Sequence, residues 1–241
     1  MARIWIPLPD VDFDVTEVSV PWKVLTRAGH EVVFTTQKGG ATPAADPLLL
    51  TGVLFGKLGA QPEPKAWYEE MISTQSFRAP QTWSGLDVTR FDALVLPGGH
   101  APGMKQYLGS EELQGKVRQF FALNRPVGAI CHGVLVAARS GVLKGRKTTC
   151  LPKYMERSAY LATFWKLGRY YRTYDAYVED EVKASLARAA DFERGPVELS
   201  VRGTDSDDSA AFVVEQANYV SARWPGDAYL FAKKLLARVR A

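Results

Sequence analysis

The sequence predicts an α/β fold, a three-layer sandwich in which helices cover both faces of a mostly parallel central sheet (flavodoxin-like). Short apolar runs rich in β-branched residues alternate along the chain with longer amphipathic stretches. Strands that alternate with helices form parallel sheets, which need helices on both faces. The stretches "PLPDVDFD", "LPGGHAPG" and "ICHG" each follow a strand-like run. In such sheets the working residues gather at the carboxyl ends of strands.

The first third of the chain begins with the strand "ARIWIPL", the loop "PDVDFD" and a helix from Asp14 to Arg27 that ends at Gly29. "HEVVFTT" is the next strand. Residues 37–66 are rich in Gly, Pro and Ala, which predicts a long insertion without a regular element. The short helix "AWYEEMI" follows this insertion.

The middle of the chain repeats the alternation. "FDALVLPGGH" is a strand that ends in a Gly-Gly turn, and "SEELQGKVRQFFAL" is an amphipathic helix. "PVGAI" is a short buried strand. It is followed by the Ala-rich helix "GVLVAAR", which Gly141 closes. "GRKTTCL" has the pattern of a fifth strand.

The last third contains an unusually aromatic segment over residues 153–172, which we expect to be helical. "VEDEVKASLARAA" is a further helix. "AFVVEQANYVSARW" alternates around "QAN" and predicts a hairpin. "PGDAYLFAKKLLARVR" starts with Pro225 in its first turn and forms the final helix. We therefore expect residues 1–241 to form a single domain.

Composition excludes several classes of protein. Two cysteines among 241 residues do not make a disulfide framework, so a reducing, cytoplasmic location is expected. No apolar window approaches the ~18 residues that a membrane span needs. The 30 basic residues are interleaved with 26 acidic ones, which disfavours a nucleic-acid partner despite a net charge of +4.

Cys131 stands between a strand and a helix, with Gly128 and Gly133 on either side. Such an elbow exposes a nucleophile at a helix N-terminus, where N–H groups lower the pKa of a thiol. The alternative is a small buried structural residue, which is common for cysteine. The spacing G-x-x-C-H-G favours the functional interpretation. Cys150 lies within a strand pattern and is expected in the core.

The stretches "TEVSVPWKVLTRAGHEV", "LPGGHAPGMKQYL", "RPVGAICHG" and "NYVSARWPGDAYLFAKKLL" together resemble the ThiJ/PfpI superfamily. That superfamily has the class I glutamine-amidotransferase-like fold. The Gly-Gly-His motif, the Cys-His pair and the chain length are most similar to its glyoxalase III and heat-inducible chaperone subgroup. The resemblance runs from the first strand to the final helix.

The resemblance implies a Cys-His-acid triad. Cys131 matches the nucleophile and His132 the histidine. Glu156 falls where the subgroup carries its acid, although the preceding loop is shorter here and the aromatic segment after it has no counterpart in the pattern. Asp175 is the alternative acid.

Glu17 matches the family glutamate that hydrogen-bonds the cysteine and exchanges protons with it. Because Asp14 precedes it by three residues, Glu17 also fits a capping box that would bond the cap N–H. Gly98 and Gly99 could supply an oxyanion N–H, together with that of His132. The family match favours Gly99, and His100 is placed beside the pocket.

The resemblance implies a cofactor-free enzyme that acts on a small-molecule carbonyl substrate such as methylglyoxal, and a homodimer. No nucleotide motif is present, and the histidines lack zinc-ligand spacing. Two alternatives stay open. One is a cysteine hydrolase, although no histidine follows His132 to make a glutamine amidotransferase. The other is a non-enzymatic redox sensor or holdase chaperone.

Overall fold

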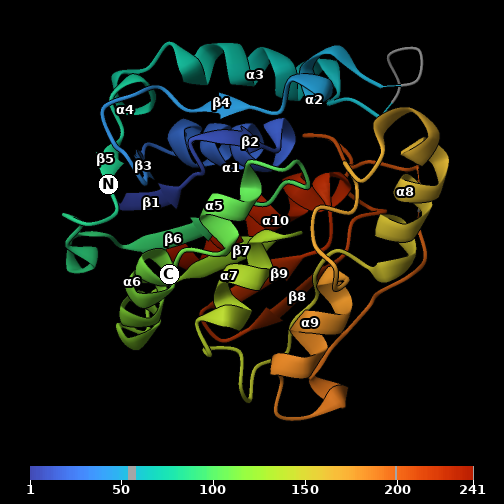
Figure 1. Cartoon of the computed structure of the whole chain (residues 1–241). Helices are drawn as coiled ribbons and strands as arrows, with labels where there is room; N and C mark the ends of the chain where they lie inside the picture. The colour runs from blue at the N-terminus through green and yellow to red at the C-terminus, as the bar shows by residue number, and fades with distance from the viewer. Residues whose placement is uncertain (54–57, 199, 241) are drawn as a thin grey trace.

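The computed structural model describes residues 1–53, 58–198 and 200–240. Its centre is a seven-stranded sheet in the order β5-β3-β1-β6-β7-β9-β8 (Figure 1). Every neighbouring pair is parallel except β8 and β9, which form an antiparallel hairpin at one edge. The strands are β1 (Arg3–Pro7), β3 (Glu31–Thr36), β5 (Gln81–Thr82), β6 (Ala93–Leu96), β7 (Val127–Ile130), β8 (Val213–Gln216) and β9 (Tyr219–Ala222).

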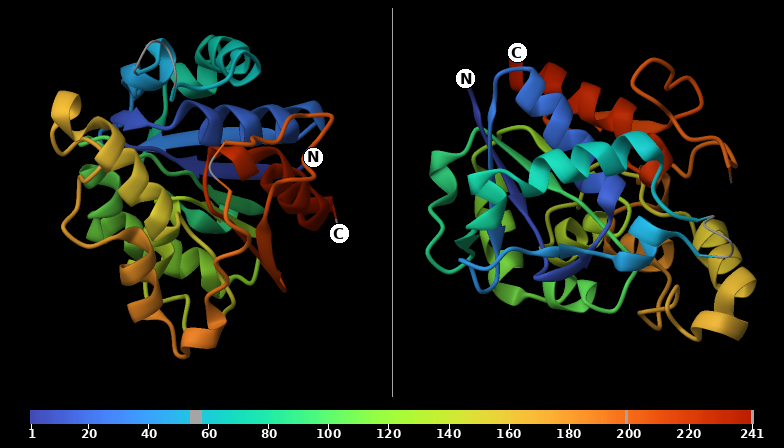
Figure 2. Two further views of the ribbon diagram at one scale, coloured as in Figure 1. Left: turned by 90° about the vertical axis from the view of Figure 1, so that its right-hand side faces the viewer. Right: turned by 90° about the horizontal axis from the view of Figure 1, so that it is seen from above.

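Helices cover both faces of this sheet, which confirms the predicted α/β sandwich (Figure 1 and Figure 2). On one face lie α1 and α10, with α3 packed on the outside of α1. The opposite face carries the other main group, in which α7 contacts α5, α6 and α9. The bounds are α1 (Val15–Arg27), α3 (Pro62–Ile72), α5 (Met104–Leu108), α6 (Glu111–Ala122), α7 (Gly133–Arg139), α9 (Val178–Ser185) and α10 (Ala228–Arg240).

The core lies where these helices meet the sheet. The central strands β1, β6 and β7 are buried on both faces and are built from apolar residues. Trp5 on β1 packs against Phe120 of α6 with ring centroids 6.1 Å apart. Its indole N–H donates to the Thr35 hydroxyl at 2.8 Å, which satisfies the one polar atom that the ring buries.

The predicted insertion over residues 37–66 contains more regular structure than expected. It includes β4 (Ala44–Ala45), α2 (Pro47–Thr51) and the first turn of α3, while residues 54–57 lie outside the described part. β4 pairs with β2 (Val11–Phe13), so the predicted loop "PDVDFD" is partly a strand. Asp46 explains the start of α2, because its carboxylate accepts a hydrogen bond from the Leu48 N–H at 2.9 Å.

Two other predictions were wrong. "GRKTTCL" is not a strand, since it makes only an isolated bridge between Thr148 and Phe192. The place beside β7 is taken by β9, and the Thr149 N–H donates to the Ser221 hydroxyl instead of to a sheet neighbour. The helix "VEDEVKASLARAA" ends at Ser185, and a 3-10 turn follows at Ala189–Asp191.

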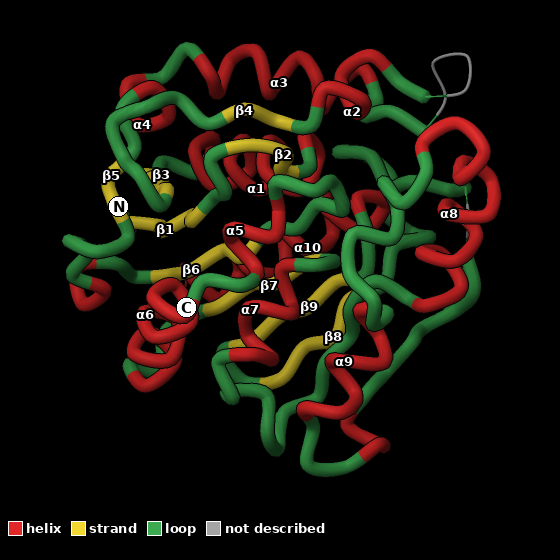
Figure 3. Tube along the Cα trace, viewed as in Figure 1, coloured by secondary structure: helices red, strands yellow, loops and turns green. Residues whose placement is uncertain are grey.

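The remaining helices are α4 (Gln75–Arg78) and α8 (Lys153–Leu167). Helix α8 forms most of the predicted aromatic segment and stands at one end of the sheet (Figure 1). Between α9 and β8 the chain runs mostly as irregular loop, drawn green in Figure 3. Further 3-10 turns lie at Val88–Arg90 and Pro225–Asp227.

Candidate active site

The carboxyl ends of β1, β6 and β7 meet where the strand order reverses direction between β1 and β6. This position is the usual ligand site of a doubly wound sheet. A cavity of about 320 Å³ opens there. It is lined by Asp14, Thr16, Glu17, Leu49, Leu58, Ala60, Gly99, His100, Cys131, Leu151, Met155, Glu156, Ser158, Ala159, Ala162, Tyr171, Arg202, Trp224 and Pro225.

Cys131 is held at the elbow in a strained backbone conformation with a φ of 57°. Such a φ costs a non-glycine residue of order 1–3 kcal/mol, so the surrounding structure must enforce it. Gly133 permits the elbow, because a Cβ there would lie 2.1 Å from the Leu96 carbonyl oxygen. The side chain of Cys131 reaches the cavity although the residue is only 5% exposed.

His132 lies directly beside the thiol. Its Nδ1 atom is 3.4 Å from the Cys131 sulfur. Burial, together with smaller contributions from the neighbouring His100 and Arg139, lowers the pKa of His132 to about 3. The imidazole is therefore neutral at physiological pH and can accept a hydrogen bond from the thiol.

Glu17 is fully buried and aimed at the same place. Its Oε2 atom accepts a hydrogen bond from the Gly98 N–H at 2.7 Å. Its Oε1 atom has no conventional hydrogen-bond partner among the described residues, and the side chain interacts with the Cys131 thiol. Burial and the nearby Asp14 carboxylate raise the pKa of Glu17 well above its ordinary value. Both effects favour the protonated form of the carboxyl group.

The capping-box alternative for Glu17 is not what the structure contains. Asp14 caps α1 alone, because its carboxylate accepts from the N–H groups of Thr16 and Glu17 at 2.8 and 3.0 Å. The Asp14 N–H, which a capping box would bond to Glu17, donates instead to the Gly98 carbonyl at 3.0 Å. The carboxyl group of Glu17 is thereby left for the site.

The pKa of the Cys131 thiol is raised, whereas the elbow position predicted a lowered value. Burial is the largest cause, and the carboxyl groups of Glu17 and Asp14 act in the same direction. The His132 N–H at the start of α7 opposes them but is weaker. The resting site therefore holds a neutral thiol and a neutral imidazole beside a carboxyl group whose protonated form burial favours.

Gly98 and Gly99 have different positions in the site. The Gly98 N–H is occupied by Glu17, and a Cβ at Gly98 would lie 2.7 Å from the His132 nitrogen. Gly99 has a φ of 150° and lines the cavity. Within the described ranges no protein group accepts a hydrogen bond from the Gly99 N–H. That N–H is therefore available to an oxygen atom in the cavity.

His100 belongs to the wall of the cavity. Its ring stacks on Tyr171 with centroids 4.2 Å apart, and its Nε2 atom is 3.8 Å from an Asp46 oxygen. Burial lowers the pKa of His100 to about 4. The ring is therefore neutral and serves as an aromatic surface beside the reacting groups.

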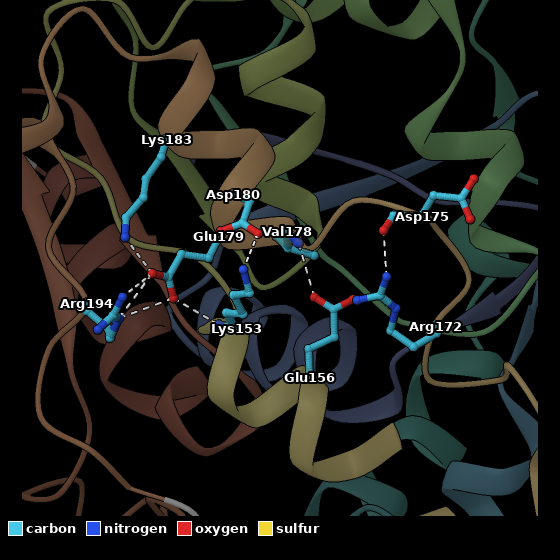
Figure 4. Close-up of polar contacts among 9 residues, drawn as sticks. All are labelled: Lys153, Glu156, Arg172, Asp175, Val178, Glu179, Asp180, Lys183 and Arg194. Carbon is cyan, nitrogen blue, oxygen red and sulfur yellow. Dashed lines mark hydrogen bonds and ion pairs between the residues drawn. The ribbon is translucent and has the colours of Figure 1, made fainter. Parts of the chain in front are cut away.

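The two candidate acids lie apart from His132. Glu156 lines the cavity, but its Oε2 atom accepts a hydrogen bond from the Val178 N–H at 3.1 Å (Figure 4). Burial raises the pKa of Glu156 to about 7. The Asp175 side chain is 98% exposed and pairs with Arg169 at 2.7 Å. Neither carboxyl group contacts the imidazole, so the identity of the third triad member stays a prediction.

Glu179 holds α8 in position over the cavity (Figure 4). Its buried carboxylate accepts hydrogen bonds from the Lys153 N–H at 2.9 Å, from Lys183 at 2.6 Å and from Arg194 at 3.1 Å. Burial alone would raise the pKa of Glu179, but the bonds from Arg194 and Lys183 outweigh it and lower the value to about 2. This ion cluster joins the start of α8 to α9 and to the loop beyond.

Several cavity residues carry no recognisable signal in the sequence. Arg202 comes from the irregular loop before β8, Trp224 from the turn after β9, and Leu49 from α2. Trp224 belongs to a stretch that resembles the family, but neither that stretch nor the surroundings of Arg202 and Leu49 indicated a site residue. Only the path of the chain brings these residues to the carboxyl edge of the sheet.

The described ranges contain neither a group of candidate metal ligands nor a helix that could span a membrane. No three His, Cys, Asp or Glu side chains in them are grouped so that they could hold a metal ion. In the same part of the chain, every helix is too short or too polar to cross a bilayer.

The chain is similar in sequence or in fold to several known proteins. A sequence model of the family described as ThiJ/PfpI family-like matches residues 8–196. An uncharacterized protein of Schizosaccharomyces pombe is 32% identical over 167 residues, which cover 66% of this chain but only 62% of that protein. A deglycase of Pyrococcus horikoshii is 30% identical over 141 residues, 58% of this chain and 68% of the deglycase. The solved structure of glyoxalase III from Candida albicans shares the fold, with a TM-score of 0.68 over 98% of this chain and 97% of that one at 17% identity.

Proposed function

The chain belongs to the ThiJ/PfpI-like family, and on that premise we propose that it is a cysteine-dependent, cofactor-free enzyme acting on small reactive carbonyls. The proposed reaction is the conversion of methylglyoxal to lactate without glutathione, or a related deglycation. The observation that carries it is the thiol of Cys131, a residue with strained backbone, at the wall of a cavity, 3.4 Å from the His132 imidazole and beside the buried Glu17 carboxyl group. The similarity to a deglycase in sequence and to a glyoxalase III in fold also supports the proposal.

In the first step the Cys131 sulfur forms a bond to the aldehyde carbon. The thiol proton passes to the neutral Nδ1 atom of His132, and the carbonyl π electrons move to the aldehyde oxygen. The Gly99 N–H donates a hydrogen bond to that oxygen as its charge develops. The Glu17 carboxyl group protonates that oxygen, which gives a hemithioacetal and leaves Glu17 as a carboxylate.

In the second step a proton moves from the former aldehyde carbon to the neighbouring carbonyl carbon through an enediol. Glu17 is suited to this transfer, because it is now a carboxylate beside the sulfur of Cys131 and burial raises its pKa, which makes it a stronger base than an exposed carboxylate. The product is a thioester of lactate on Cys131. Water then cleaves the thioester, releasing lactate and the thiol. The former aldehyde carbon is oxidised as its neighbour is reduced, so no external oxidant is needed. The overall reaction converts methylglyoxal and water to lactate and a proton.

The test measures lactate formed from methylglyoxal by the purified protein in the absence of glutathione. We expect turnover by the parent and a loss of at least about 100-fold in kcat for Cys131→Ser and Glu17→Gln, since each removes a group from the reacting centre. Cys150→Ser is the matched control, because that buried thiol lies outside the cavity.

Turnover that survives in Cys131→Ser would contradict the proposal. A parent that forms no lactate but cleaves amide substrates through Cys131 would indicate the hydrolase alternative. A parent without either activity, but with Cys131 selectively oxidised by mild peroxide, would indicate a redox sensor.

A further inference from the structure

Arg202 lines the same cavity as Cys131 but differs from the other enclosed arginines of the protein. Arg223 is fully buried and donates to both carboxylate oxygens of Asp227 at 2.8 Å. Arg139 is paired with Glu181 at 2.6 and 2.9 Å. In residues 1–53, 58–198 and 200–240, no group forms a hydrogen bond or an ion pair within 4 Å with the Arg202 guanidinium. That guanidinium lies 5.4 Å from the ring of Trp224.

The Arg202 side chain is partly exposed, so its guanidinium keeps contact with solvent while no protein acceptor among the described residues occupies its donors. The nearest acidic group, Asp14, attracts Arg202 at longer range. The Asp14 carboxylate is already the cap of α1, where it accepts two backbone N–H groups. Glu17 attracts Arg202 more weakly than Asp14 does. Arg202 borders both the cavity of Cys131 and a neighbouring hollow that Glu63 and Tyr229 help to line, and its donors are available to a molecule in the former.

The remainder of the cavity limits what that molecule can be. Arg202 is the one Lys or Arg among the described residues that line it, so a single negative charge fits better than a phosphate dianion. A planar guanidinium matches a carboxylate in a two-point contact. The cavity has a volume of about 320 Å³. This volume holds many water molecules and is larger than a three-carbon dicarbonyl needs.

We propose that Arg202 binds a carboxylate of the substrate, so that the preferred substrates are 2-oxoaldehydes carrying a carboxylate remote from the reacting carbonyl. The aldehyde end would reach Cys131 while the carboxylate contacts Arg202 across the cavity. Apolar side chains such as Leu49, Met155 and Ala159 would contact the carbons between them. The reaction in this inference rests on the proposed function, whereas recognition of the carboxylate does not.

The experiment compares 4,5-dioxopentanoate with its methyl ester, which differs only in lacking the charge. We expect the parent to prefer the acid by about 10- to 100-fold in kcat/KM, as for a charge-assisted two-point contact. Arg202→Gln should abolish this preference by raising KM for the acid, with little change for the ester. Arg202→Lys keeps the charge but not the planar geometry and should retain part of the preference.

Equal turnover of acid and ester by the parent would overturn the inference. So would a loss in Arg202→Gln that is the same for both substrates, because that pattern indicates a structural role beside Asp14. If the parent forms no product from either substrate, the proposed function fails, and binding is then read from the rate at which iodoacetamide alkylates Cys131. Protection by pentanoate but not by pentanamide, lost in Arg202→Gln, would support the inference. Equal protection by both compounds would overturn it.

Discussion

Cys131 combines a φ of 57° with a side chain at the wall of a cavity, and the neutral forms of its two polar neighbours, Glu17 and His132, are favoured in the resting site. Burial accounts for this neutrality, since it raises the pKa of Glu17 and lowers that of His132. The proton that must leave the thiol therefore has an acceptor in contact, and no fixed charge has to be displaced first. The same burial makes the site sensitive to pH.

Glu17 should reduce stability as the pH rises. The folded protein retains a proton on this carboxyl group that the unfolded chain releases above its ordinary pKa. The contribution of Glu17 is therefore complete below that value and is lost with increasing pH, by at most about 1.4 kcal/mol per pH unit. Glu17→Gln imitates the protonated form. We expect its advantage over the parent in urea unfolding to grow between pH 5 and pH 8.

Glu179 provides a control of opposite sign. Its folded pKa of about 2 is below the ordinary value, so its contribution is present above that ordinary value and is lost as the pH falls toward 2. Glu179→Gln should be less stable than the parent at pH 7, with a gap that closes in acid. An advantage of Glu17→Gln that is the same at every pH would show that the carboxyl group is ionised in the folded protein.

At the scale of elements, the close approach of α7 to β6 gives the elbow its shape. The first residue of α7 is Gly133, and its Cα lies so near the end of β6 that a Cβ would collide with two backbone carbonyls, those of Leu96 and Pro97. Backbone atoms cannot move aside as a flexible side chain can. The position of Cys131 therefore depends on the absence of one carbon atom in the next element.

Gly133→Ala should cost about 3 kcal/mol in the free energy of unfolding, because the added Cβ would lie 2.1 Å from the Leu96 carbonyl oxygen. Gly115→Ala is the matched control within α6, where a Cβ meets nothing within 4 Å. That change should stabilise the protein by about 0.5–1 kcal/mol through helix propensity. Urea unfolding midpoints measure both. Tolerance of Gly133→Ala would show that the elbow can relax without its glycine.

At the scale of the whole molecule, the site is assembled from segments far apart in the chain. Helix α1 contributes Glu17, the loop after β6 contributes Gly99, and the loop before β8 contributes Arg202. They meet because the parallel strands β1, β6 and β7 are neighbours and end at the same edge. Helix α8, held by the Glu179 cluster, closes one side of the cavity.

The homodimer that the family resemblance implies is a prediction at this scale. Light scattering coupled to size-exclusion chromatography should give a mass twice the 26.6 kDa of the chain, independent of dilution over a tenfold range. An obligate dimer keeps its mass on such dilution, whereas a chance association dissociates. The mass of a single chain at every concentration would contradict the prediction.

The alternation of strands and helices was predictable because each element carries its own period of apolar residues. The hairpin "AFVVEQANYVSARW" is the antiparallel pair β8–β9, as its pattern predicts. "GRKTTCL" has an equally good strand pattern but lies outside the sheet, because β9 occupies the place beside β7. Propensity describes a segment, whereas membership of a sheet depends on which segments compete for a position.

The sequence by itself determined the fold class and indicated Cys131 and the Gly98–Gly99 pair through short motifs at strand ends, and the family resemblance implied the roles of Glu17 and His132. Only the tertiary structure decided the protonation of the thiol, the surroundings of Glu156 and the arrival of Arg202 at the cavity. The physical reason is that motifs are local, whereas desolvation and the meeting of distant loops depend on the whole packed chain.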